Sequence, residues 1–180
     1  MSQYQSSRIS HRMGTGGAFW GITGVLMLLG SAVYRLTPLA LEAFSYDLLW
    51  YHWVSLSLSL FLMAYAEGYR GFQQRFSPRV AARARYLAEH PRALHILLGP
   101  LFCMGYFYAT RRRKVTSFSV TAAIVLLILL VHFMPQPWRG IVDAGVVCGL
   151  IWGIVTVLFF GISAFTSEDF AFSPEVPGEE

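Results

Sequence analysis

The sequence predicts an all-helical integral membrane protein with four transmembrane helices and one re-entrant segment. The first observation is composition, since 55% of the 180 residues are hydrophobic and only 13% are charged. A soluble domain carries about 25% charged residues, so this chain does not have a soluble protein's surface. The second observation is that the fourteen cations are concentrated between long apolar runs. The third is a Gly-Pro pair in the middle of one such run.

The predicted spans follow from length, because a helix needs about 20 apolar residues to cross a hydrocarbon core of ~30 Å. Four segments satisfy this requirement, at about residues 18–34, 48–66, 118–134 and 141–165. Segment 93–110 is also long enough, but Gly99-Pro100 lies near its midpoint. Proline removes a backbone donor and disfavours helix at the preceding residue. We therefore predict that this segment enters and leaves on one side, and the alternative is a fifth span.

The distribution of positive charge favours four spans over five. Arginine and lysine in short loops are retained on the cytoplasmic side. With a re-entrant segment at 93–110, twelve of the fourteen cations share one side and only Arg35 and Arg139 lie opposite. With five spans, the run from Arg111 to Lys114 moves to the other side and the asymmetry weakens to nine against five. The prediction is that both termini are cytoplasmic, with a bacterial inner membrane as the default location.

A short amphipathic helix is predicted at about residues 78–89, between the second span and the re-entrant segment. Ser77-Pro78 is typical of a helix start. Arg79, Arg83 and Arg85 flank an apolar stripe, which suits a helix lying on the inner leaflet against anionic lipids. The alternative interpretation is simple anchoring by positive charge. Lipid, and not nucleic acid, is the expected anionic partner.

The last fifteen residues differ in character from the rest of the chain. Residues 166–180 are rich in acidic residues, serine, proline and glycine, and we expect a disordered tail there. Residues 1–165 are expected to form a single polytopic membrane domain.

Two stripes of glycine predict close helix packing. Gly145, Gly149 and Gly153 recur at four-residue spacing in the last span, and the first span carries a second stripe of small residues. Its glycines include Gly17, Gly21 and Gly24. Small residues let helix backbones approach closely in a membrane. The stripes are expected to pack within the chain, and the alternatives are a homo-oligomer or a larger membrane complex.

Ionisable residues predicted at membrane depth define a candidate polar site near the outer leaflet. With four spans, His52, His132 and Asp143 come from three helices and reach similar depth, and Arg139 precedes Asp143 by one helical turn. Three functions suit this set. The two histidines could ligate a b-type haem, a His-Asp pair could relay protons, or two histidines and one aspartate could hold a divalent metal. The alternative is structural: hydrogen-bonded interfacial histidines and an Arg-Asp pair at a helix N-terminus.

A second candidate polar group lies at the inner side. Glu67 and Arg70 are three residues apart at the end of the second span, and His95 begins the re-entrant segment. These residues suit a polar vestibule beneath irregular backbone, as in channels and carriers. The alternative is a helix end closed by an ion pair.

The sequence contains no motif that identifies a reaction. It has no H-E-x-x-H and no G-x-S-x-G, so an enzymatic function is not indicated, although missing motifs do not exclude one. We therefore expect a non-enzymatic membrane protein, either a small oligomeric permease or an accessory or assembly subunit. The second hypothesis is a single-haem electron carrier with His52 and His132 as ligands, and the sequence assigns no metal.

Overall fold

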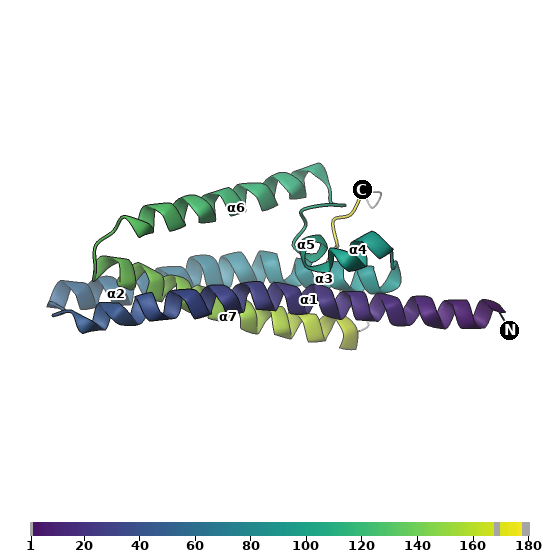
Figure 1. Cartoon of the computed structure of the whole chain (residues 1–180), viewed down its shortest axis with the longest axis horizontal. Coiled ribbons are helices and arrows are strands. Elements are labelled where there is room, and N and C mark those ends of the chain that lie inside the picture. The colour runs from purple at the N-terminus through teal and green to yellow at the C-terminus, as the bar shows by residue number, and fades with distance from the viewer. Residues whose placement is uncertain (1, 168–169, 178–180) are drawn as a thin grey trace. The chain divides into compact units, whose positions relative to one another are not determined.

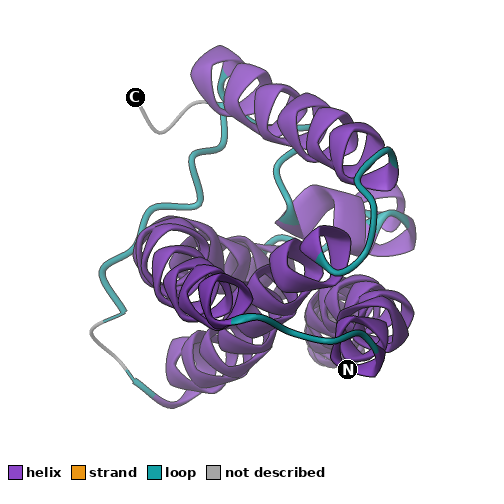
Figure 2. Ribbon diagram, turned by 90° about the vertical axis from the view of Figure 1, so that its left-hand side faces the viewer, coloured by secondary structure: helices purple, strands orange, loops and turns teal. Residues whose placement is uncertain are grey.

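The computed structural model describes residues 2–167 and 170–177, with side chains from Met13 onward, and contains only helices and loops over those ranges (Figure 2). Figure 1 shows the helices coloured in chain order. Three helices are long and apolar enough to cross a membrane: the part of α1 and its extension from Met13 to Ser45, α6 (Arg111–His132) and α7 (Trp138–Thr166). The chain is therefore all-helical, as predicted, and its long apolar helices are consistent with a membrane protein.

The first helix is much longer than the predicted span. Helix α1 runs from Ser2 to Glu42 and continues into a short 3₁₀ helix, η1 (Ala43–Ser45). At 1.5 Å per residue its 41 residues extend about 60 Å, roughly twice the thickness of a hydrocarbon core. The length of an apolar run predicts only the part of a helix that can lie in the hydrocarbon core. The polar N-terminal part of α1 was therefore not expected to be helical.

The predicted second span forms part of an unbroken helical run that changes its hydrogen bonding. Helix α2 (Trp50–Met63) leads into a π-helical segment, η2 (Ala64–Phe76), which leads into α3 (Ser77–Glu89). Helices of the π type are rare and usually limited to one turn, so thirteen residues in this form are unusual. Because α2 alone has only 14 residues, it does not count among the long apolar helices.

The segment predicted to re-enter the membrane is broken where Gly99-Pro100 lies. Helix α4 (Ala93–Leu97) and helix α5 (Gly99–Cys103) have five residues each, and Leu98 between them is not helical. Five residues extend about 8 Å, so neither helix crosses a ~30 Å core. After α5 the chain turns through Gly105, whose φ of +81° is readily adopted only by glycine.

The described chain divides into two compact units. Unit 1 contains residues Met1–Met27, Phe76–Phe118 and Val157–Glu180, and unit 2 contains Leu28–Arg75 and Ser119–Thr156. Four helical segments therefore run from one unit into the other, at residues 27/28, 75/76, 118/119 and 156/157. Helices α3, α4 and α5 and the loop to α6 belong wholly to unit 1.

Unit 2 is built on the glycine stripe of α7, which lies against α2 and η2. A Cβ atom added at Gly145 would clash with Ser59, whose hydroxyl donates a hydrogen bond to the carbonyl oxygen of Ile141 at 3.1 Å. A Cβ atom at Gly149 would lie 3.0 Å from Oε2 of Glu67. Real Cβ atoms are seldom found this close to another heavy atom, so a larger residue at either position requires its neighbours to move.

The contact between α7 and η2 interlocks in both directions. Gly153 of α7 receives the ring of Phe72, and Gly68 of η2 receives the side chain of Trp152. The indole Nε1 of Trp152 then donates a hydrogen bond to Oε1 of Gln73 at 2.9 Å. Each helix thus supplies both a large side chain and a bare backbone position, which gives close packing in a membrane, where the hydrophobic effect does not drive helices together.

The glycine stripe of α1 lies against different elements, in unit 1. Added Cβ atoms there would meet side chains of the broken α4–α5 segment. The pairs are Gly17 with Ile96, Gly21 with Cys103, and Gly24 with Pro100. The stripe therefore lets the Gly-Pro break approach the α1 backbone. The two glycine stripes contact different elements of the same chain.

Helix α3 begins and ends close to the predicted residues 78–89, but most of it is buried inside unit 1. Its buried residues occur on several faces and include Val80, Ala82, Arg83 and Leu87. A helix lying on a lipid surface would bury only one stripe. The expectation of a surface helix failed because sequence periodicity does not show that α5 packs against α3.

The α7–η2 packing predicts a specific sensitivity to side-chain volume. We expect Gly149→Leu to destabilise the protein by about 2 kcal/mol, because the new side chain must displace Glu67 or separate the helices. The matched control is Gly30→Leu, also in unit 2, where an added Cβ meets nothing within 4 Å. Thermal melting of both variants in detergent, followed by circular dichroism, measures the difference. Equal melting temperatures for the two variants would contradict the packing.

Candidate functional site

The most constrained polar group in unit 1 is Arg83 of α3, which is 1% exposed. Its guanidinium donates four hydrogen bonds to backbone carbonyl oxygens. The acceptors are Phe102 at 2.6 Å, Pro174 at 2.8 Å, Tyr108 at 2.9 Å and Phe107 at 3.0 Å. The same guanidinium lies 4.2 Å from the centroid of the Phe102 ring, within range of a cation–π interaction.

This arrangement keeps a positive charge inside the protein. Burial lowers the pKa of Arg83 to about 10. Neighbouring ionisable groups have smaller effects, some of which raise this pKa while that of Arg113 lowers it. Arg83 therefore remains protonated at neutral pH. Arginine suits the position because its planar fork of donors reaches several acceptors at once. Arg83 was predicted to face lipid together with Arg79 and Arg85, whereas in the structure it joins α3 to the α5–α6 loop and to the C-terminal segment.

A single carboxylate, that of Glu175, lies between two further arginines. Its Oε1 is 3.0 Å from Nε of Arg79, and its Oε2 is 4.0 Å from Nε of Arg113. Its backbone carbonyl oxygen accepts a hydrogen bond from the Thr110 amide at 3.1 Å. We refer to Arg79, Arg83, Arg113 and Glu175 as the arginine cluster.

The C-terminal segment takes part in this cluster. We expected residues 166–180 to be disordered, and in the described part of that range α7 continues to Thr166 and Val176 is fully buried. Residues 170–177 have no regular secondary structure apart from a turn at residue 177. This segment is held by the hydrogen bond from the Arg83 side chain to the Pro174 carbonyl oxygen and by the ion pair between Arg79 and Glu175. Amino-acid composition alone does not predict such contacts.

His95 lies beside the arginine cluster in an aromatic environment. Its ring is 4.8 Å from that of Phe102 and 4.6 Å from that of Tyr108, measured between centroids. Its Nδ1 has no hydrogen-bond partner among the described residues. The guanidinium of Arg92 lies 5.1 Å from the Tyr108 ring. The contacts of His95 are thus with aromatic rings, whereas we predicted that it belongs to a polar vestibule with Glu67 and Arg70.

The other two members of the inner polar group, Glu67 and Arg70, lie on η2 in unit 2. Glu67 packs against Gly149, and Arg70 is exposed. Within the described ranges no ion pair joins these two side chains. The expected pair assumed α-helical spacing, and π-helical hydrogen bonding to residue i+5 widens each turn, so residues three apart no longer share a face.

The outer candidate site contains one of the expected interactions. Nε of Arg139 lies 3.7 Å from Oδ2 of Asp143, and Asp143 is buried. The two residues are one helical turn apart, as predicted, near the N-terminus of α7. The separation is too long for a hydrogen bond, and neither atom has another hydrogen-bond partner in the described structure.

The two histidines have different environments. His52 is buried at the start of α2, where its Nδ1 accepts a hydrogen bond from the Leu49 amide at 3.1 Å and its ring lies 5.0 Å from that of Trp138. His132 is exposed at the end of α6, and its ring contact is with Phe133. Within the part of the chain described, no three His, Cys, Asp or Glu side chains are grouped as metal ligands. The haem, proton-relay and metal hypotheses stay predictions.

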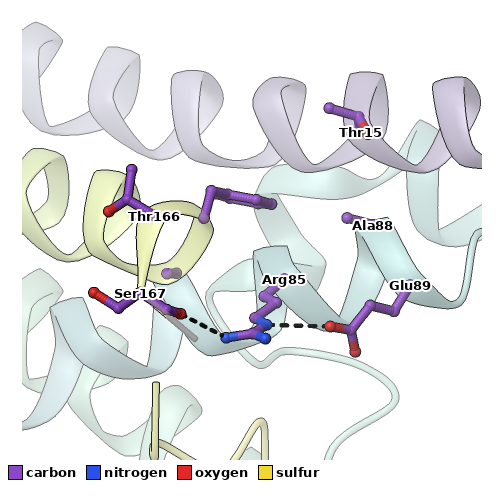
Figure 3. A pocket seen from close by; sticks show the side chains of 8 residues that line it. Thr15, Arg85, Ala88, Glu89, Thr166 and Ser167 are labelled. Carbon is purple, nitrogen blue, oxygen red and sulfur yellow. Dashed lines mark hydrogen bonds and ion pairs between the residues drawn. The ribbon is translucent and has the colours of Figure 1, made fainter. Parts of the chain in front are cut away.

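Arg85, the third arginine predicted to face lipid, borders an open pocket of about 390 Å³ in unit 1 (Figure 3). Its Nε donates to Oε1 of Glu89 at 3.1 Å, and its Nη1 donates to the carbonyl oxygen of Ser167 at 3.3 Å. Thr15 of α1 and Thr166 of α7 also line the pocket. Because the guanidinium is already paired on two sides, the pocket offers little unsatisfied polarity to a ligand.

Sequence reasoning missed Glu175, Arg113 and Phe102 as members of a site. Charge complementarity was the available signal, since an acidic C-terminal segment follows a strongly basic middle region. Nothing in the sequence indicated which acidic residue would return to which arginine.

The buried guanidinium yields a test of the arginine cluster. We expect Arg83→Met to destabilise the protein by at least about 3 kcal/mol, because four carbonyl oxygens lose a donor and only that of Phe102 keeps the Gly105 amide among the described contacts. The Arg83→Lys variant should be destabilised as well, since an ammonium lacks the planar fork of donors. The control is Arg85→Met on the same helix, where an exposed ion pair contributes less than about 1 kcal/mol. Detergent thermal melts measure all three, and equal losses in the two methionine variants would contradict the role of Arg83.

Comparison with known proteins gives no functional assignment. No protein-family model, no curated protein and no solved structure matches this chain. The function must therefore be argued from the chain's own residues.

Proposed function

We propose that this chain is a non-enzymatic integral membrane protein that acts as an accessory or assembly subunit of a larger membrane complex. The observation that carries the proposal is the exposure of α6. Its most apolar 18-residue window is 6% buried, whereas the corresponding window of α7 is 33% buried. A helix with apolar side chains on all its faces and few contacts in its own chain is suited to pack against helices of another protein.

The buried charges support a structural role more than transport. Arg83 is bound to backbone carbonyl oxygens, and Asp143 lies beside Arg139 on the same helix. A carrier needs ionisable groups that reach a substrate or an ion. The alternative within this proposal is a small oligomeric permease, in which α6 would pack against a second copy of the chain.

We propose that four helices span the membrane, that segment 93–110 re-enters, and that both ends of the chain are cytoplasmic. The path of the chain between the units supports this topology. Residues 76–118 stay within unit 1, which also contains the N-terminal residues and the end of α7. Ten of the fourteen cations belong to unit 1, including Arg111, Arg112, Arg113 and Lys114. This distribution accords with retention of unit 1 on the positive side.

Labelling engineered cysteines with an impermeant maleimide tests the topology in intact cells. With four spans, Arg112→Cys should be shielded from the outside and Asp47→Cys should react. With five spans, residues 47 and 112 share the outer side, so both would react. A cysteine replacing Ser6 fixes the side of the N-terminus in the same experiment. Labelling of residues 47 and 112 from the same side would contradict the re-entrant segment.

Site-specific crosslinking tests the accessory role. A photoreactive diazirine amino acid at Leu126, an exposed position of α6 in unit 2, should give one discrete adduct with a different protein. The same group at Leu56, which is buried in α2 of unit 2, should give none. An adduct of twice the chain's mass would favour the oligomeric permease. Crosslinks to lipid alone would contradict both forms of the proposal. An absorption spectrum of this preparation, made with haem available, tests the electron-carrier hypothesis.

A further inference from the structure

The arginine cluster contains more positive charge than its one carboxylate can balance. Three guanidinium groups, those of Arg79, Arg83 and Arg113, lie around Glu175. The four hydrogen bonds of Arg83 go to neutral carbonyl oxygens, so they satisfy its donors without balancing its charge. An additional negative charge would therefore be stabilised here. Guanidinium groups bind phosphate and carboxylate well because their donors match the acceptor oxygens.

We infer that Arg79 and Arg113 form a binding site for a phosphate group, and that the carboxylate of Glu175 occupies this site in the structure. The inference goes beyond the accessory role and does not depend on it. The ligand is identified by its phosphate, which a lipid headgroup or a soluble phosphate compound would supply.

An independent observation at Arg113 points to a missing ligand atom. Its side chain is 6% exposed, and its Nε has no hydrogen-bond partner among the described residues. The nearest acidic oxygen, Oε2 of Glu175, is 4.0 Å away, beyond hydrogen-bond distance. Leaving a buried charged donor without an acceptor costs more than leaving a neutral one. The donor therefore faces a position that Glu175 fills only in part.

The shapes of the two anions explain why phosphate suits the site better. A carboxylate has two oxygens in one plane, and Glu175 uses one of them at 3.0 Å from Arg79. A phosphate monoester has three strong acceptor oxygens in a tetrahedral arrangement, and a phosphodiester has two. A phosphate between the two arginines could accept from both Nε atoms at hydrogen-bond distance. The additional negative charge of a monoester would also suit the excess of positive charge.

The site can exchange its occupant without unfolding of the segment. The side chains of Arg79 and Glu175 are each 32% exposed, so solvent reaches the ion pair. Ion pairs of this kind are weak because solvent screens the two charges. Main-chain carbonyl oxygens of Pro174 and Glu175 accept hydrogen bonds from Arg83 and Thr110, so the carboxylate can rotate away while the segment stays bound.

The test is calorimetric titration of the purified full chain in an uncharged detergent. The probes are short-chain phosphatidylglycerol, inorganic phosphate and, as a control lipid without phosphate, short-chain diacylglycerol. We expect Glu175→Gln to bind the anionic probe about fivefold more tightly, because a competing charge is removed, and Arg79→Gln to bind about fivefold more weakly. The matched control is Arg112→Gln, which removes the same charge from an exposed neighbour of Arg113 and should stay within about twofold of the wild type.

The remaining outcomes are also decisive. Binding of phosphatidylglycerol but not inorganic phosphate, with the expected changes in the variants, assigns the site to a lipid headgroup. Binding of inorganic phosphate with the same changes assigns it to a soluble ligand. An equal loss in Arg79→Gln and Arg112→Gln would overturn the inference in favour of diffuse surface charge. So would unchanged or weaker binding by Glu175→Gln, or no binding to either anion. The half-exposed Arg79 is used because replacing the buried Arg113 risks unfolding.

Discussion

Unit 1 depends on a single constraint, that backbone carbonyl oxygens outside a helix need donors from elsewhere. The chain leaves α5 at Cys103 and does not become helical again until Arg111, so the loop's carbonyl oxygens lack the regular amide donors of a helix. Arg83 supplies donors to two carbonyl oxygens of the loop, to the end of α5 and to Pro174. One guanidinium thus supplies donors to carbonyl oxygens that a continuous helix would have satisfied with its own amides, at the end of α5 and in the loop that follows it.

Unit 2 solves the opposite problem, because its helices need no external donors and only have to approach closely. Gly149 and Gly153 of α7 accept Glu67 and Phe72, while Gly68 accepts Trp152 in return. Packing of this kind relies on dispersion contacts and on the hydrogen bond from the indole to Gln73. The wide π-helical turns of η2 set the spacing at which these side chains meet α7. Hydrogen bonds from a buried side chain to backbone carbonyl oxygens are therefore prominent in unit 1, and close packing of complementary helix surfaces is prominent in unit 2.

The sequence predicted the features that depend on local patterns. Apolar run length located the long helices, and Gly99-Pro100 located a helix break, because both effects act within a few residues. Tertiary contacts decide the rest. Arg79, Arg83 and Arg85 look alike in sequence, yet one pairs with Glu175, one is buried among carbonyl oxygens and one pairs with Glu89. No local pattern in the sequence indicated the π-helical form of η2, and this form separates the expected Glu67–Arg70 pair.

The arginines of unit 1 serve two requirements that act against each other. In the topology that we propose, positive charge retains this part of the chain on one side of a membrane, and the same charge repels itself once the helices pack. Glu89 and Glu175 offset part of the repulsion, at Arg85 and between Arg79 and Arg113. The remainder is offset neither by carbonyl oxygens, which carry no net charge, nor by any further ion pair within the described ranges. The phosphate group that we infer at Arg79 and Arg113 would offset part of this remaining repulsion, and the carboxylate of Glu175 competes with it for the same two arginines.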